Sequence, residues 1–217
     1  MKIKVLFADD HAVFHECVKA LFSPEENIQV IATASDGRTA VRLARELKPD
    51  VIVMDLSMPV LNGIDATRQI IAENSAAKVL ALSSHKDRKT ILSALKAGAR
   101  GYVVKDAAIA ELLQAIEAVG SGRMYLSSHI IDQVIDSLLV GDEDPAREAS
   151  PLDRLSARER EILQLLAEGR NAREVAKMLS VSPKTIESHR HNIMQKLGVE
   201  SSSDLIRLAI REGLTTL

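Results

Sequence analysis

Several residue types that mark common protein classes are scarce in this chain of 217 residues. It has one cysteine, Cys17, so no disulfide can form within the chain, and a reducing compartment is expected. It has no tryptophan and only 2% aromatic residues, so its cores must be built from aliphatic side chains. No apolar run reaches the roughly 18 residues that a membrane span needs, and no signal-peptide pattern is visible. We therefore expect a cytoplasmic protein with no membrane partner.

Charge of either sign is not in excess, but the two signs are distributed unevenly along the chain. Residues 1–150 carry 17 Lys and Arg against 21 Asp and Glu, whereas residues 151–217 carry 11 against 9. The slightly basic balance of the C-terminal part permits nucleic-acid binding there without requiring it.

The first 120 residues alternate between apolar strand patterns and helical patterns. Short connections between five such βα units predict a five-stranded, doubly wound parallel sheet over residues 1–121. The expected strands are 3–8, 28–33, 51–54, 78–82 and 101–104, and the expected helices are 12–22, 37–47, 64–73, 88–97 and 107–119.

Residues 122–150 are expected to connect two domains. Apolar residues at helical spacing over 127–139 predict a helix. The acidic stretch over 140–151, which is nearly free of large apolar groups, is typical of a flexible linker.

Every pattern over residues 151–217 predicts helix, and we expect a small all-α domain of four helices. Ser156 and Glu159 form a capping-box pattern, Asn171 opens the second helix, Ser182 with Pro183 opens the third, and Ser202 or Ser203 opens the fourth. A tight turn joins the second helix to the third, which predicts a helix-turn-helix arrangement.

Carboxylates follow two of the predicted strands. Asp55 ends the apolar run 51–54, and Asp9 with Asp10 follows the strand at 3–8. The carboxyl ends of parallel strands share one edge, where ligands bind in open α/β sheets. Three carboxylates there suit Mg²⁺, and Asp55 could attack a phosphoryl donor to form an acyl phosphate. Two further strand ends offer the hydroxyl of Ser83 and the ammonium of Lys105 to a phosphoryl group.

Four stretches resemble a response-regulator receiver domain: ADDH at 8–11, VIVMDLSMPVLNG at 51–63, ALSSH at 81–85 and GARGYVVKD at 98–106. The resemblance implies that Asp55 accepts the phosphoryl group. It implies that Mg²⁺ is held by Asp9, Asp10, Asp55 and the backbone carbonyl of Ser57. By the same resemblance Ser83 is the switch hydroxyl, Lys105 pairs with the phosphoryl group, and Tyr102 is an aromatic residue that rotates.

The third helix of the C-terminal part has a polar, partly cationic side that suits phosphates and base edges. The stretch from Leu155 to Val199 resembles a LuxR-type DNA-binding domain, and the whole chain resembles a NarL/FixJ-family response regulator. The DNA contacts that this resemblance implies are Lys184, Thr185, Glu187, Ser188, Arg190, His191 and Lys196. Many relatives carry Lys where Glu187 stands, so no base preference can be transferred.

The fourth helix of that part offers more apolar surface than one small core needs. LuxR-type domains usually dimerise through this helix, which implies a dimer interface at Leu205, Ile206, Leu208 and Ala209.

We therefore expect a non-enzymatic transcriptional regulator of a two-component system, with a histidine kinase and double-stranded promoter DNA as partners and a homodimer as its phosphorylated form. A haloacid-dehalogenase-like phosphatase is an alternative, but it would need an acidic residue where Ser57 stands. A flavodoxin-like flavin protein would need a hydroxyl-rich loop after the first strand, where DDHAVF stands instead. A DNA-binding protein that no longer uses phosphorylation is a third possibility.

Overall fold

The computed structural model describes residues 2–22, 25, 27–107, 109–128, 130–131 and 150–215. Most of the helix expected over 127–139 and of the linker expected over 140–151 therefore lies outside the described residues. In the part that is described, no helix is both long and apolar enough to cross a bilayer.

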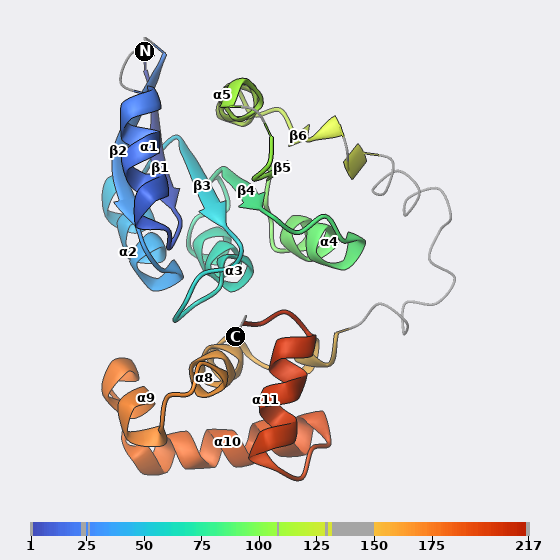
Figure 1. The fold of residues 1–217 in the computed structure, drawn as a ribbon. Coiled ribbons are helices and arrows are strands. Elements are labelled where there is room, and N and C mark those ends of the chain that lie inside the picture. The colour runs from blue at the N-terminus through green and yellow to red at the C-terminus, as the bar shows by residue number, and fades with distance from the viewer. Residues whose placement is uncertain are drawn as a thin grey trace. The chain divides into compact units, whose positions relative to one another are not determined.

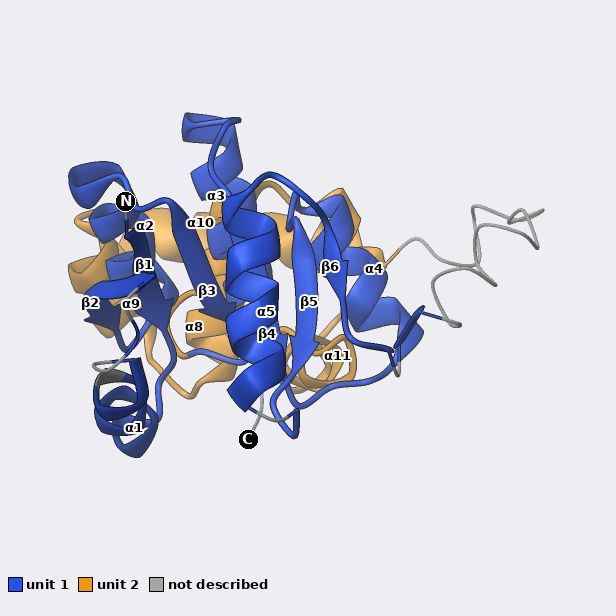
Figure 2. Ribbon diagram, turned by 90° about the horizontal axis from the view of Figure 1, so that it is seen from above, with its two compact units in different colours: residues 1–58, 62–143 blue, residues 59–61, 144–217 orange. Residues whose placement is uncertain are grey.

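The chain divides into two compact units. One contains residues 1–58 and 62–143, and the other contains residues 59–61 and 144–217 (Figure 2). The larger unit is an α/β domain and the smaller is helical, as the sequence predicts.

The described residues of the first unit form one six-stranded sheet in the order β2-β1-β3-β4-β5-β6, and every neighbouring pair is parallel (Figure 1). The five expected strands are confirmed, but the expected strand count is wrong by one. The additional strand, β6, has only two residues and lies beside β5. The strands are β1 Ile3–Ala8, β2 Ile28–Ala34, β3 Val51–Asp55, β4 Val79–Ser83, β5 Gly101–Val104 and β6 Tyr125–Leu126.

Helices cover both faces of this sheet, as βα connections of one hand require. One apolar cluster joins α1 and α5 to the strand residues on one face, and another joins α4 to those on the opposite face. Helices α2 and α3 lie on the same side as α4 (Figure 1). The helices are α1 Ala12–Phe22, α2 Gly37–Leu47, α3 Gly63–Glu73, α4 Arg88–Lys96 and α5 Ile109–Gly120.

The central strands are apolar at successive positions because both of their faces are buried. All five residues of β3 and all five of β4 are buried. Successive side chains enter opposite clusters: Leu80 and Leu82 contact the α5 side, and Ala81 between them contacts the α4 side. A polar residue is therefore expected only where a strand ends, and Asp55 and Ser83 hold those terminal positions.

The described residues of the second unit form a short 3₁₀ helix and four α-helices around one aliphatic core. Its elements are η1 Pro151–Arg154, α8 Ala157–Ala167, α9 Ala172–Leu179, α10 Pro183–Leu197 and α11 Ser202–Arg211. The predicted capping box at Ser156 is confirmed, and Asn171 forms a second one. The N-cap of the last helix is Ser201, one residue before the earlier of the two expected caps, because Ser201 accepts the hydrogen bond from the Asp204 backbone N–H.

Candidate functional site

Asp9 and Asp55 lie side by side at the carboxyl edge of the sheet. Strands β1 and β3 are neighbours, and Ala8 lies opposite Met54, so the residues that follow them meet at the same level. Both carboxylate residues are almost completely buried, with relative exposures of 0% and 1%. Buried carboxylates are costly unless cations or hydrogen bonds compensate them, so this edge requires positive charge.

Lys105 supplies the first positive charge. It follows β5 directly, and its Nζ lies 2.8 Å from Asp9 Oδ2 and 2.8 Å from Asp55 Oδ2. Burial raises the pKa of Asp55, and the ammonium of Lys105 only partly opposes that effect. Burial also lowers the pKa of Lys105, but its two carboxylate partners outweigh this and raise it overall. One ammonium cannot neutralise two carboxylates, so the edge keeps a negative charge.

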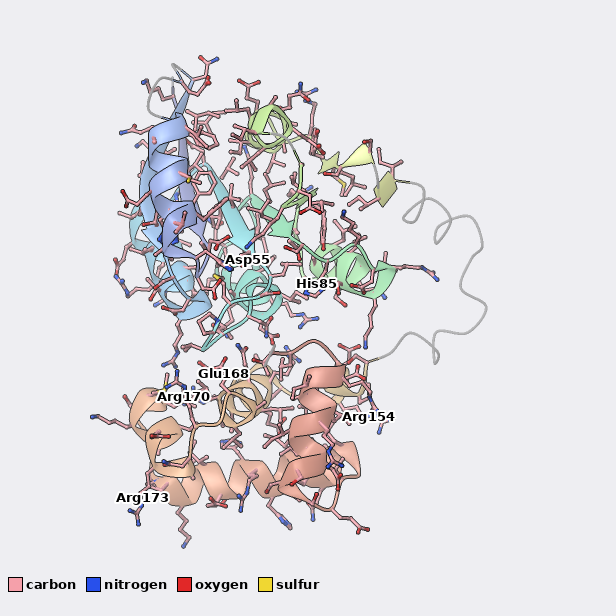
Figure 3. The ribbon with its side chains drawn as sticks, viewed as in Figure 1. Asp55, His85, Arg154, Glu168, Arg170 and Arg173 are labelled. Atoms are coloured by element: carbon pink, nitrogen blue, oxygen red, sulfur yellow. The ribbon has the colours of Figure 1, made fainter. Side chains whose placement is uncertain are left out.

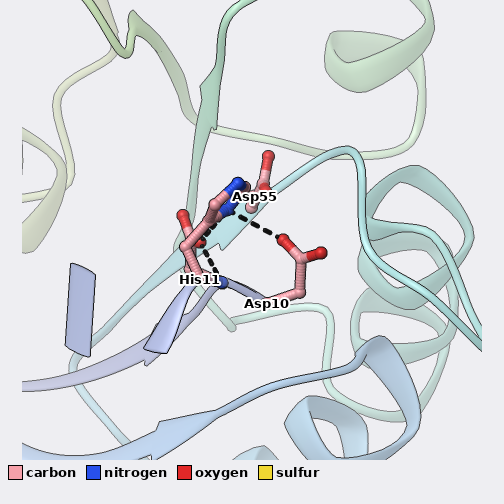
Figure 4. A group of neighbouring side chains, drawn as sticks. Asp10, His11 and Asp55 are labelled. Atoms are coloured by element: carbon pink, nitrogen blue, oxygen red, sulfur yellow. Dashed lines mark hydrogen bonds and ion pairs between the residues drawn. The ribbon is translucent and has the colours of Figure 1, made fainter. Parts of the chain in front are cut away.

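Asp10 and His11 complete the acidic cluster. One ligand atom from each of Asp9, Asp10, His11 and Asp55 lies within 4.8 Å of all the others. His11 Nδ1 lies 3.0 Å from Asp10 Oδ1 (Figure 4). It also lies 2.9 Å from Asp9 Oδ1, so the imidazole bridges the acidic pair. Three carboxylates in one cluster with residual negative charge fit a hard divalent cation such as Mg²⁺.

Asp9, Asp10 and Asp55, which were predicted to share one site, lie together in this cluster. His11 was not among the predicted site residues. The only available signal was its position next to Asp10, because the folding of its ring back over the carboxylates is a matter of side-chain geometry.

The loop after Asp55 passes close to it. The backbone N–H of Ser57 donates to Asp55 Oδ1 at 3.2 Å. A β-carbon at Gly63 would lie 1.9 Å from the backbone oxygen of Asp55, so only glycine fits there. Asn62 caps α3 by accepting from the Asp65 N–H, which fixes where the loop ends. The role of the Ser57 carbonyl as a metal ligand stays a prediction.

Ser83 ends β4, the strand next to Asp55, and Tyr102 lies on β5, one strand further along the sheet; both are fully buried. Ser83 Oγ accepts from the backbone N–H of His85 at 3.2 Å, and the Tyr102 hydroxyl donates to the His85 carbonyl at 2.7 Å. Burial raises the pKa of Tyr102 to about 12, although a hydrogen bond with Ser83 opposes that shift. The backbone of His85 is thus hydrogen-bonded to both Ser83 and Tyr102, the two residues predicted to take part in switching.

The predicted helix-turn-helix is present as α9 and α10. Ser182 caps α10 and Pro183 occupies its first turn. Of the residues predicted to contact DNA, Lys184, Glu187, Ser188 and His191 are exposed along one side of α10, and Thr185 and Arg190 are partly exposed beside them. A groove of about 320 Å³ opens at the start of this helix, lined by Ser182, Lys184, Thr185, Ser188, His189 and Asn192.

Two predicted contacts have partners within this unit. Lys196 Nζ lies 2.8 Å and 2.7 Å from the carboxylate oxygens of Glu159, at the start of α8. This ion pair gives Lys196 a structural partner that the sequence reasoning did not foresee. Arg190 lies 2.6 Å from Glu187, one turn earlier on α10, so the acidic residue partly neutralises its cationic neighbour.

Three exposed residues near this face were not predicted. Gln195 is exposed on α10 along the side that bears Ser188 and His191. Arg173 and Lys177 are exposed on α9, and Arg173 extends away from its helix (Figure 3). In helix-turn-helix proteins the helix before the recognition helix crosses the DNA backbone, so basic residues there could have been inferred from position alone.

The structure corrects part of the dimerisation prediction. Leu205, Leu208 and Ala209 are 1%, 9% and 0% exposed and belong to the core cluster of their own unit. They close that core against α8, so they are not available to a second chain. Ile206 alone among the predicted interface residues is partly exposed.

Comparisons with known proteins agree with the geometry of the acidic site in the first unit and of the helix-turn-helix in the second. Residues 5–117 match the family model for the response regulator receiver domain, and residues 153–209 match that for bacterial regulatory proteins of the luxR family. The chain is 36% identical over 215 residues to the transcriptional regulatory protein MctR of Rhizobium johnstonii, covering 99% of this chain and 96% of MctR.

Two solved structures extend the comparison. One is a LuxR-family two-component response regulator from Aurantimonas sp. SI85-9A1, with a TM-score of 0.61 and 37% identity, covering 64% of this chain and 99% of that one. The other is RcsB from Salmonella enterica serovar Typhimurium, with a TM-score of 0.59 and 26% identity, covering 96% of this chain and 98% of RcsB.

The sheet, its acidic edge and the separate helix-turn-helix unit define a two-domain response regulator, and they confirm the resemblance seen in the sequence. The chain belongs to the family of two-component response regulators that join a receiver domain to a LuxR-type DNA-binding domain, of the NarL, UvrY and DegU kind. Its family function is regulation of transcription.

Proposed function

We propose that Mg²⁺-dependent phosphorylation of Asp55 by a partner histidine kinase controls how this regulator binds promoter DNA. One observation carries the proposal: Asp55 is buried beside Asp9 and the ammonium of Lys105 at an edge that retains negative charge. A carboxylate held this way is a nucleophile, a metal ligand and a charge sensor at once.

In the proposed transfer, a carboxylate oxygen of Asp55 attacks the phosphorus of a phosphohistidine. An O–P bond forms, the P–N bond breaks, and its electron pair returns to the imidazole of the kinase. Asp9, Asp10 and Asp55 would hold the magnesium ion, with the Ser57 carbonyl as a further ligand, and the ion would supply charge neutralisation for the transferred group. Lys105 already lies within hydrogen-bond distance of Asp55 and would pair with a phosphoryl oxygen.

The new group adds roughly −1.5 to −2 charges at neutral pH. Ser83 ends the adjacent strand, so its hydroxyl can be drawn toward a phosphoryl oxygen. That movement would change the hydrogen bonds of the 83–85 segment, to which the Tyr102 hydroxyl is fastened. The switch is then a shift between two packings around Tyr102.

The output is proposed to be double-stranded DNA, read by α10 and its exposed residues Lys184, Glu187, Ser188 and His191. RcsB has been solved bound to the promoter P1flhDC in the presence of phosphomimetic BeF3⁻, which supports the same pairing of phosphorylation with DNA binding here. We also propose a homodimer in the phosphorylated state, with Ile206 on α11 as its partly exposed apolar contact.

An enzymatic role has less support. Phosphatases that use an Asp nucleophile carry a second acidic residue two positions later as a proton donor. That position here is the uncharged Ser57. The relatives carry names of transcriptional regulators, which agrees with a switch rather than a turnover enzyme.

The test is DNA affinity with and without phosphoryl donor. A duplex would first be selected from a random library by the full chain, and affinity would then be measured by fluorescence anisotropy with acetyl phosphate and Mg²⁺. Affinity should rise on the order of tenfold for the natural chain and not for Asp55→Asn. Asp106→Asn, which removes an exposed carboxylate near the same edge, is the matched control and should respond normally. An equal response of Asp55→Asn would refute the proposal.

A further inference from the structure

After α5 the chain returns to the sheet and pairs with the strand that carries Tyr102. Gly101 lies opposite Tyr125, and Tyr102 lies opposite Leu126. A β-carbon at Gly101 would lie 2.7 Å from the Tyr125 carbonyl oxygen, so the two strands approach closely. We call residues 125–128 and 130–131 the return segment. In the sequence it leads directly into the connection to the second unit.

Ser127 fastens the return segment to two elements at once. It is fully buried, and its backbone N–H donates to the Tyr102 carbonyl at 3.0 Å. Its Oγ donates to Glu111 Oε1 on α5 at 2.5 Å and accepts from the Val104 N–H at 3.4 Å. Ser128, the next residue, is exposed. A buried hydroxyl with partners on both β5 and α5 holds the segment in one register.

Ile130 places the segment inside the apolar cluster that surrounds the Tyr102 ring. Both residues are 0% exposed, and both belong to the cluster that includes Ile91 and Ala94 of α4. Ile131, beside it, is 36% exposed. Because interiors are close-packed, the Tyr102 ring cannot leave its position without leaving a void in the cluster to which Ile130 belongs.

We infer that Ile130 and Ser127 are positioning residues that report the state of Tyr102 to the interdomain connection. When the ring is buried, Ile130 has its packing surface and the return segment stays on β5. When the ring moves out, Ile130 loses that surface and the return segment detaches from β5. The residues of the segment then add to the length of chain that connects the receiver unit to the DNA-binding unit. Phosphorylation draws Ser83 toward Asp55 and favours the buried ring, so it tightens the segment. This inference rests on the proposed function, because it needs Asp55 to be the input.

The experiment measures amide hydrogen exchange of the full chain with and without beryllofluoride and Mg²⁺, a stable mimic of the phosphoryl aspartate. In the natural chain, peptides covering the return segment should exchange more slowly by about tenfold when the mimic is present. Ile130→Ala should lose this slowing, and its gain in DNA affinity with the mimic should fall from about tenfold to about twofold or less. Ile131→Ala is the matched control and should behave as the natural chain does.

Two further variants separate coupling from simple loss of stability. Ile130→Val removes one methylene and should restore most of the slowing. Ser127→Ala should weaken it, whereas Ser128→Ala should not. If Ile130→Ala and Ser127→Ala keep both the slowing and the full gain in DNA affinity, the inference is wrong. If the mimic slows exchange around Asp55 but not at the return segment of the natural chain, the inference is wrong and the proposed function stands. If it slows exchange at neither place, the proposed function itself fails.

Discussion

Replacement of Lys105 by methionine should destabilise the receiver unit much more than loss of an ordinary surface lysine. Its ammonium lies 2.8 Å from both Asp9 and Asp55, which are 0% and 1% exposed. Removing one partner of a buried ion pair typically costs about 3–5 kcal/mol, because a buried charge is left uncompensated. We expect a loss of about 3 kcal/mol here, since the Lys105 side chain is 19% exposed and one carboxylate can take up a proton instead.

The assay is urea unfolding at neutral pH without divalent cations, followed by tyrosine fluorescence. The chain has two tyrosines and no tryptophan, and both Tyr102 and Tyr125 lie in the receiver unit, so the signal reports that unit alone. Lys86→Met is the matched control. Lys86 lies 3.0 Å from Asp106, but these side chains are 53% and 72% exposed, so its loss should cost less than about 1 kcal/mol.

The dependence of the stability loss on pH and on Mg²⁺ distinguishes this electrostatic explanation from a loss of packing by the aliphatic part of the lysine side chain. The deficit of Lys105→Met should shrink as pH falls, because Asp55, whose pKa burial raises, then takes up a proton and loses its uncompensated charge. Mg²⁺ at a hundredfold excess over its dissociation constant stabilises a chain that binds it by about 2.7 kcal/mol. The deficit should therefore also shrink with Mg²⁺, to the extent that the variant, which lacks the competing ammonium, binds the ion more tightly than the natural chain does. A deficit equal to that of Lys86→Met, or one that neither pH nor Mg²⁺ changes, would refute the reasoning.

Three further outcomes follow from single contacts. Gly63→Ala should lower receiver stability by about 2–3 kcal/mol and slow phosphorylation by acetyl phosphate, since its β-carbon would lie 1.9 Å from a β3 carbonyl oxygen; unchanged urea midpoints would contradict this. Lys196→Met should destabilise the helical unit by about 1 kcal/mol above pH 5, and by less as pH falls through the lowered pKa of Glu159. The salt dependence of DNA binding should stay nearly constant. A reduced salt dependence with unchanged stability would instead make Lys196 a phosphate contact. The Tyr102 phenol should stay protonated past pH 10 and contribute stability that is lost as pH rises from 10 toward 12, which ultraviolet titration of a Tyr125→Phe variant can follow; tyrosinate formation near pH 10 in the folded chain would contradict it.

Much of the fold was predictable because burial on both faces leaves a plain pattern in the sequence. Short runs of mostly apolar residues, continuous in the case of residues 51–54, predicted the strands, and the polar residues that end them predicted the site edge. Strand β6 was missed because Tyr125 and Leu126 alone carry no periodicity. It is a strand only because Gly101 lets its backbone approach β5, and that is a tertiary contact.

The residues of the site could be predicted from the sequence, but the contacts between their side chains could not. Asp9, Asp55 and Lys105 could be placed at one edge because parallel strands end together. The sequence did not show that the Lys105 ammonium contacts both carboxylates, or that His11 bridges the acidic pair. Both contacts depend on side-chain rotamers, which the spacing of residues in a sequence does not determine. The number of apolar residues on α11 suggested that some were left over for a dimer interface. Most of them are instead buried in the core of their own four-helix unit.

The most direct test of the central claim is the intact mass of the full chain after incubation with acetyl phosphate and Mg²⁺. The natural chain should gain the mass of one phosphoryl group, and the gain should disappear with EDTA or in Asp55→Asn. A chain that never gains this mass, or an Asp55→Asn variant that gains it equally, would contradict Asp55 as the phosphorylated carboxylate.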